Sequence, residues 1–143
     1  MTKKVKLKFD AILEGFEFVS SVSPTEHAAF ICRKTGDVIF YSEHLVAEEP
    51  LPEDIDETGK FISIPHKNDL DLGKSLALKF TAEVLPGAIR DVEGIFSRAG
   101  AYSRFKDFLT RSDKLEQWYE YEKREQENAL RAWCQLNDLE VDG

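Results

Sequence analysis

The stretch AAFICRKTGDVIFYS, residues 28–42, decides the fold because two apolar runs flank a short turn signal. Lys34, Thr35 and Gly36 separate the runs, a spacing typical of a three-residue hairpin loop. Gly36 would take the left-handed backbone conformation in this loop, since glycine lacks the Cβ atom that disfavours it. Counting outward from the loop sets the register of the two strands. The predicted opposite pairs are Arg33–Asp37, Cys32–Val38, Ile31–Ile39 and Phe30–Phe40.

The predicted hairpin is apolar on both of its faces. A hairpin with one solvated face would alternate apolar and polar residues instead. We therefore expect both faces to be covered, and a second copy of the chain is a natural cover for one of them. In this register one face carries Phe30, Cys32, Val38 and Phe40, and the other carries Ile31, Ile39 and Tyr41.

Shorter strands and one helix are predicted around the hairpin. Lysine alternates with apolar residues over 4–9, which is the period of a strand with one solvated face. Apolar residues at helical spacing follow over 11–19, and Asp10 is placed to cap that helix. Residues 61–64 favour a third strand, and residues 139–141 favour a brief final one.

An acidic segment separates the hairpin from the third strand. Residues 43–58 contain seven acidic side chains and neither lysine nor arginine, and Pro50 and Pro52 lie among them. Runs of like charge repel one another, and proline interrupts regular structure. We expect a mobile acidic loop at about 43–58 and no domain boundary there, because no internal repeat and no second core follow it.

The C-terminal half has the periodicity of helices. Asn68 or Asp69 is placed to cap a helix whose apolar residues recur every four positions. A Pro-Gly turn at 85–88 ends this helix. The apolar ridge consists of Leu72, Leu76, Phe80 and Val84.

Three more helices are predicted beyond that turn. One covers 89–99 and would end at Gly100, and a short one covers 100–110. The last begins near Asp113, because Asp113 and Glu116 have the spacing of a capping box, and it runs to about Leu136. Asn137 then suits the C-cap of this helix.

These elements predict one α+β domain over residues 1–143. Its small antiparallel sheet is built on the hairpin at about 28–42 and packs with four to five helices, mostly in the C-terminal half. The chain is 42% hydrophobic and 32% charged, with a net charge of −8. This composition excludes a disordered chain, and the negative charge gives no bulk attraction to phosphate backbones.

The sequence also bears on membrane association and on the redox state of the cysteines. No stretch approaches the roughly 20 apolar residues that a membrane span needs, so no membrane partner is predicted. Cys32 and Cys134 lie far apart and share no motif. They are interpreted as reduced, buried thiols of a cytoplasmic protein.

The residues of catalysis and metal binding do not form a motif. His27, His44 and His66 have no partner at metal-ligand spacing, and neither cysteine has the neighbours of an activated thiol. No Gly-x-Ser-x-Gly motif and no phosphate-binding glycine loop is present. We assign no catalytic, cofactor-binding or metal residue and expect no cofactor.

The segment GAYSRFKDFLT, residues 100–110, combines aromatic and basic residues in an acidic chain. On a helical wheel Phe105 lies in the apolar arc, whereas Arg104 lies outside it. We predict that Phe105 is buried and that Arg104 and Lys106 are not both buried. Asp107 is placed to pair with Arg104.

Two interpretations of this basic segment stay open. It is a helix with an apolar face in the core, or it binds a phosphate group or an acidic partner. The aromatic residues of the last helix present the same choice between packing and an interface. The candidate partner-binding residues are Arg98, Arg104, Lys106, Arg111, Trp118 and Tyr121.

Four segments in this order resemble the bacterial uncharacterised protein family 0158, and the resemblance spans nearly the whole chain. They are RKTGD at 33–37, GAYSRFKD at 100–107, WYEY at 118–121 and ALRAW at 129–133. The family shows a TGE-type hairpin, a GAFRRFKD segment, a WYxF pair and a closing AxxWL helix.

The chain departs mildly from that pattern. It has Tyr102 and Tyr121 where the family tends to have phenylalanine, and Cys134 where it tends to have leucine. The family has no established activity, so the resemblance supplies no catalytic residues. It implies a small cytoplasmic α+β protein.

Three functional hypotheses follow. The leading one is a non-enzymatic cytoplasmic protein-interaction domain that associates with another protein or with itself. The second is a regulator that binds nucleic acid or a phosphorylated ligand through the basic segment 90–111. The third is a small enzyme whose site is assembled from dispersed residues such as Glu26, His27, Glu43 and His44.

Overall fold

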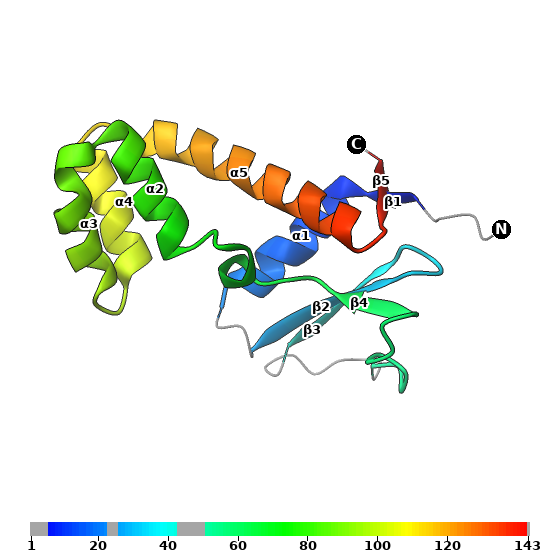
Figure 1. The fold of residues 1–143 in the computed structure, drawn as a ribbon. Helices are drawn as coiled ribbons and strands as arrows, with labels where there is room; N and C mark the ends of the chain where they lie inside the picture. Colours follow the sequence, from blue (N-terminus) through cyan, green and yellow to red (C-terminus); the bar gives the residue numbers. More distant parts are fainter. Residues whose placement is uncertain (1–5, 23–25, 43–50, 143) are drawn as a thin grey trace. The chain divides into compact units, whose positions relative to one another are not determined.

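The computed structural model describes residues 6–22, 26–42 and 51–142. They divide into two compact units, one of residues 1–70 with 129–143 and the other of residues 71–128. Helices and strands are both present, so the predicted α+β class is confirmed (Figure 1). Folding as a single domain stays a prediction, and each unit is described by itself.

The first unit contains two small sheets. In the larger one, β2 (His27–Cys32) lies between β3 (Val38–Ser42) and β4 (Phe61–Ser63), and both pairings are antiparallel. In the smaller one, β1 (Lys6–Lys8) pairs in parallel with β5 (Glu140–Asp142). The predicted strands before and after the hairpin are therefore confirmed. The N-terminal part of the first one lies outside the described residues.

The hairpin register is shifted by one residue from the prediction. Ile31 lies opposite Val38, and the loop has four residues, Arg33–Gly36. Gly36 has the predicted left-handed conformation, with φ of 81°. The shift follows from β4, because the Arg33 N–H donates to the Lys60 carbonyl oxygen at 2.8 Å. The backbone of Arg33 therefore bonds to the segment that leads into β4, and Arg33 forms no pair with β3.

Helix α1 (Phe9–Ser20) covers one face of the larger sheet (Figure 1). Its buried residues Ile12 and Phe16 pack in the same core as Ala29 and Ile31 of β2. The predicted cap is wrong, because the N-cap is Lys8 and Asp10 lies in the first turn. Phe9 begins the helix, which shortens the first strand.

The other face of the larger sheet has no helix over it among the described residues. The register shift places Phe30, Ile39 and Tyr41 on this face, and Val38 and Phe40 on the α1 face. The predicted face compositions are therefore wrong. Phe30 and Ile39 are half-buried, and Tyr41 is 37% exposed. Covering of this face by a second copy stays a prediction.

The end of α5 completes the first unit. This helix runs from Leu115 to Leu136, and its last residues pack on the unit's core through Leu130 and Cys134, both buried. The Arg131 guanidinium lies 4.1 Å from the centre of the Phe9 ring. Cation–π and apolar contacts therefore hold this end of the helix.

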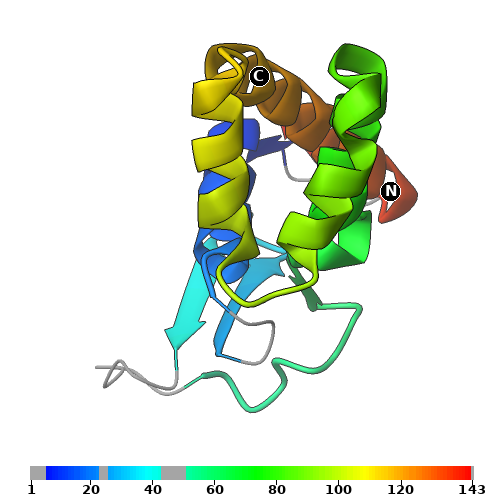
Figure 2. The same ribbon diagram turned by 90° about the vertical axis from the view of Figure 1, so that its left-hand side faces the viewer.

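The second unit is helical. Helices α2 (Lys74–Val84), α3 (Ile89–Phe96) and α4 (Ala101–Arg111) pack together, and Figure 2 shows α4 in yellow beside the green α2 and α3. The 3₁₀ turn Pro86–Ala88 joins α2 to α3. The core is rich in aromatic side chains. Its buried members include Leu76, Phe80, Val92, Phe105, Leu109 and Trp118.

Several helix ends differ from the prediction. α2 begins after Gly73, because Asn68 and Asp69 lie in a separate 3₁₀ turn, Lys67–Leu70. α3 ends at Phe96, and Gly100, with φ of 72°, lies at the start of α4. The residue types predict a helix boundary at these positions, but they do not show whether a residue ends one helix or begins the next.

Asp113 does not form the predicted capping box. It has a φ of 58° and closes α4, since Lys114 N–H donates to the Leu109 carbonyl and Asp113 N–H to the Thr110 carbonyl. This is the Schellman arrangement of a helix C-terminus. The same pattern closes α5 around Asp138, which confirms Asn137 as its C-cap.

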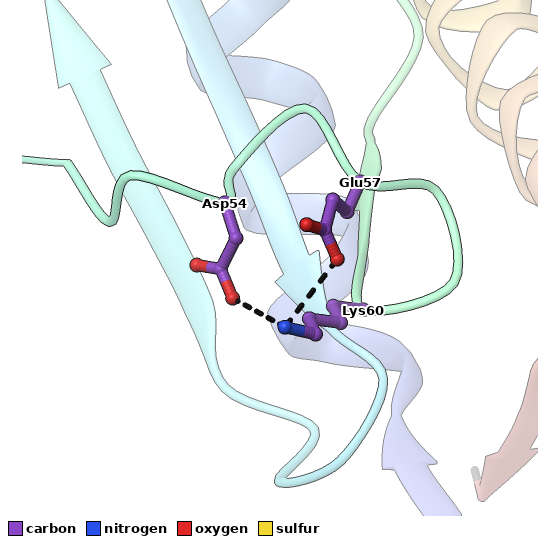
Figure 3. Close-up of polar contacts among 3 residues, drawn as sticks. All are labelled: Asp54, Glu57 and Lys60. Atoms are coloured by element: carbon purple, nitrogen blue, oxygen red, sulfur yellow. Dashed lines mark hydrogen bonds and ion pairs between the residues drawn. The ribbon is translucent and has the colours of Figure 1, made fainter.

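The described part of the acidic segment is organised by one lysine. Lys60 Nζ lies 3.0 Å from an Asp54 carboxylate oxygen and 3.3 Å from one of Glu57 (Figure 3). The hydrogen bonds with Lys60 lower the pKa of the Asp54 carboxyl. These groups are exposed, so the pairs contribute little to stability. Mobility of the loop at 43–58 stays a prediction, and residues 43–50 lie outside the described part.

Candidate functional site

Two of the six candidate partner-binding residues are buried in the core of the second unit. Trp118 has no exposed surface and Tyr121 is 6% exposed. The Trp118 ring contacts Phe80 and Phe105 edge-on, with centroids 5.3 and 5.1 Å apart. Phe105 is fully buried, as predicted. These aromatic residues pack the core, so neither Trp118 nor Tyr121 is presented to a partner.

The basic candidates lie nearer the surface of that unit. Arg104 donates through Nη2 to the Ile95 carbonyl oxygen at 3.1 Å, and Lys106 Nζ lies 4.8 Å from the centre of the Tyr102 ring. Both are half-buried, which confirms that they are not both buried. The predicted pairing of Asp107 with Arg104 does not occur among the residues described. Arg98 and Arg111 are exposed, and partner binding by them stays a prediction.

The polar atoms of the aromatic core differ in their partners. The Tyr102 hydroxyl donates to a Glu122 carboxylate oxygen, and burial together with this bond raises the pKa of Tyr102 far above its usual value. Trp118 Nε1 and the Tyr121 hydroxyl are buried with no hydrogen-bond partner within the described structure. Burial is also the main reason why the pKa of Tyr121 is raised.

The ring nitrogens of the two described histidines contact main-chain groups. His66 is buried, accepts at Nδ1 from the Asn68 N–H, and therefore donates through Nε2 to the Val22 carbonyl oxygen. His27 stacks on Phe18 with ring centroids 4.2 Å apart. His44 lies outside the described residues. Across 6–22, 26–42 and 51–142 no cluster of three metal-binding side chains occurs.

The two cysteines are free thiols with opposite environments. Cys134 is buried, and burial raises its pKa to about 11. Cys32 is only half-buried, which corrects the expectation of two buried thiols, and a hydrogen bond from the Thr35 side chain lowers its pKa.

An open groove of about 450 Å³ runs along β3 in the first unit. Its charged lining residues are two lysines and two acids, so the groove is neutral overall. It contains neither cysteine nor histidine. The residues that shape it include Lys6, Lys8, Glu14, Asp37, Val38 and Phe40.

Val38 and Phe40, which line this groove, belong to a strand at the edge of the three-stranded sheet. The Cys32 N–H donates to the Asp37 carbonyl, so the hydrogen-bonded pairs of the hairpin are Cys32–Asp37 and every second pair beyond it. The N–H and C=O groups of Val38 and Phe40 consequently point away from β2. Among the described residues, no strand pairs with this edge of β3.

The side chains of the same strand are unusually exposed for their type. Phe40 is 41% exposed and Tyr41 is 37% exposed, although they belong to different faces of the sheet. An apolar strand with an unpaired edge is a template for pairing with another chain. Sequence reasoning overlooked this edge. The signal was present, because Val38–Ser42 holds no charge, proline or glycine that would protect an edge strand.

Comparison with protein-family models, with curated proteins and with solved structures finds no match to this chain. The resemblance to the uncharacterised protein family 0158 therefore stays a prediction. Among the described residues, no helix combines the length and apolar character that crossing a membrane requires.

Proposed function

We propose that the protein is a non-enzymatic cytoplasmic protein-interaction domain that binds through the β3 edge and its groove. The observation that carries this proposal is the unpaired, uncharged strand Val38–Ser42, with Phe40 and Tyr41 exposed on it. Polypeptide is the class of ligand that such an edge recognises, because main-chain groups supply the hydrogen bonds. The two free thiols support a reducing compartment.

The chemistry of the described side chains supports binding over catalysis. His66 is committed at both ring nitrogens, and His27 is stacked on Phe18 with Nδ1 at 3.0 Å from the Phe18 carbonyl oxygen. An enzyme assembled from Glu26, His27, Glu43 and His44 remains a second hypothesis, since two of these residues lie outside the described part.

Substitution at the edge tests the proposed function. Phe40→Lys places a charge on the β3 edge at a side chain that is already 41% exposed, so we expect it to fold and to lose binding. Leu136→Lys is the matched control, because Leu136 is 86% exposed and belongs to another element of the same unit. Binding is measured as self-association by light scattering and as retention of purified partner proteins. Equal binding by both variants would contradict the proposal.

A regulator that binds nucleic acid or a phosphorylated ligand is the alternative. The exposure of Arg98 and Arg111 favours it. Its test is the fluorescence anisotropy of a labelled oligonucleotide, with salt titration, for the wild type and for Arg98→Glu/Arg111→Glu. Salt-sensitive binding that the double variant loses would support the regulator, because phosphate contacts release counterions.

A further inference from the structure

We infer that the occupant of the β3 edge is a second copy of this chain, paired antiparallel through β3 about a two-fold axis at Ile39. This inference rests on the proposed function and names its partner. In the pair, Ile39 lies opposite Ile39 of the other copy, and Val38 lies opposite Phe40. The result is one continuous sheet with α1 of both copies on the same face.

The unpaired backbone groups select this register. Val38 and Phe40 each present an N–H and a C=O outward, and pairing Val38 of one copy with Phe40 of the other satisfies all of them reciprocally. A two-fold at Phe40 would instead place Phe40 opposite Phe40 of the other copy, and Val38 opposite Ser42.

The side chains are complementary to themselves in the same register. Phe40 shares the α1 face with Val38, and the groove beside Val38 is open to solvent. The Phe40 ring packs edge-on against Phe18 of its own chain, with centroids 5.1 Å apart, and its exposed side lies beside the groove of the other copy, which Lys6 and Lys8 line. On the opposite face, the two Ile39 side chains meet as a closely spaced pair that lacks hydrogen bonds.

The area involved sets the strength of the pair. An aromatic side chain has about 200 Å² of surface, so Phe40 and Tyr41 at 41% and 37% exposure leave roughly 80 Å² each to cover. Stable interfaces bury about 1,200 Å² or more. The pair is therefore weak and concentration-dependent, and the measurements should span about 10 μM to 1 mM.

Sedimentation and light scattering across this range give the first test. We expect the wild type to approach twice the mass of the chain, Leu136→Lys to do the same, and Phe40→Lys to stay at the mass of one chain. Far-ultraviolet circular dichroism of the variants verifies that each is folded. A dimer that persists in folded Phe40→Lys would overturn the β3 pairing.

Cysteine cross-linking tests the register itself, and it uses a Cys32→Ser background because Cys32 lies on the same face as Ile39. Ile39→Cys should form a disulfide between copies on mild oxidation, since closely spaced pairs have Cα atoms about 4.5 Å apart. Tyr41→Cys should not, because the two residues 41 would lie roughly 13 Å apart along the strands. Cross-linking through Tyr41→Cys and not through Ile39→Cys would overturn the inference.

The failure of this inference can be told from the failure of the proposed function. A wild type that stays at the mass of one chain at about 1 mM overturns self-pairing. If a different purified protein then binds the wild type and not Phe40→Lys, the β3 edge is still an interaction site. If neither occurs, both proposals fail.

Discussion

A Cβ atom added to Gly15 of α1 would lie 2.5 Å from Ile64 Cδ1, and 3.3 Å from Val38 Cγ1. Real Cβ atoms do not approach other carbon atoms so closely, because such contacts are strongly repulsive. Gly15 is thus a point of close approach between the helix and the sheet. The absence of its side chain lets α1 bury Ile12 and Phe16 against the larger sheet.

Gly15→Ala should lower the free energy of unfolding by about 1–2 kcal/mol. Overpacking against Ile64 and Val38 costs about 1–3 kcal/mol, and the better helix propensity of alanine offsets up to about 1 kcal/mol of this. Chemical denaturation measures the change. Adding Ile64→Val removes the clashing Cδ1 atom, so the double variant should lose less stability than the two single changes together.

Gly94→Ala is the control for helix propensity. Gly94 lies in α3, and a Cβ atom added there meets nothing within 4 Å. This change should raise the free energy of unfolding by up to about 1 kcal/mol. If Gly15→Ala and Gly94→Ala both raise the free energy of unfolding, α1 does not approach the sheet as closely at Gly15 as the structure has it.

Phe105→Ala should lower the free energy of unfolding by about 3–5 kcal/mol, because it empties a fully buried aromatic site beside Trp118. Arg104→Ala should cost about 1 kcal/mol or less, since Arg104 loses one hydrogen bond from a half-buried position. Thermal melting of both variants gives the comparison. A Phe105→Ala protein that melts like the wild type would show that α4 is wrongly oriented.

Local periodicity was enough to predict the position of Phe105. An amphipathic helix places one stripe in the core whatever it packs against, so the wheel located Phe105 and the helices of the second unit without tertiary information. The same wheel did not locate the contacts of Arg104. Those depend on Ile95 in the preceding helix, which spacing within one helix does not report.

The hairpin register could not be predicted from residues 28–42 alone. The turn signal allows loops of three or four residues, and the choice is made by the bond from Arg33 to Lys60, a contact distant in sequence. A one-residue slip moves every side chain to the other face. The sequence therefore predicted an apolar hairpin but assigned Val38 and Phe40 to the wrong neighbours, and the β3 edge went unnoticed.

Substitution of Asp113 tests how α4 ends. Its φ of 58° costs an ordinary residue about 1–2 kcal/mol, and glycine adopts this conformation freely. We expect Asp113→Gly to raise the free energy of unfolding by up to about 1 kcal/mol and Asp113→Ala to lower it. Denaturant titration of the pair measures the difference. A capping role for Asp113 would instead make both variants less stable than the wild type, because neither glycine nor alanine carries the capping oxygen.

The two tyrosines near Trp118 should respond oppositely to loss of their hydroxyl groups. Tyr121→Phe removes a buried hydroxyl that has no partner, so stability should stay unchanged or rise by about 1 kcal/mol. Tyr102→Phe removes the bond to Glu122 and should cost about 1–2 kcal/mol. Equilibrium unfolding of the two variants decides the point. Equal losses in both would mean that the Tyr121 hydroxyl is hydrogen-bonded.

The two thiols should differ in their reactivity toward iodoacetamide. The thiolate is the nucleophile, so a lowered pKa makes Cys32 reactive below the pH at which an ordinary cysteine ionises. The pKa of Cys134 is raised to about 11 by burial, so this thiol should stay unmodified at pH 8 until the protein unfolds. Mass spectrometry of peptides after timed alkylation follows both sites.

Thr35→Val supplies the control for this difference, because the Thr35 side chain is the main cause of the lowered pKa of Cys32. Its loss should move the rise in alkylation rate of Cys32 to higher pH and leave Cys134 unchanged. In the folded wild type, the rate at Cys32 should increase with pH and level off at a lower pH than it does for an ordinary cysteine, once the thiolate is fully formed. Modification of Cys134 before Cys32 in folded protein would contradict the burial of Leu130 and Cys134 against the core of the first unit.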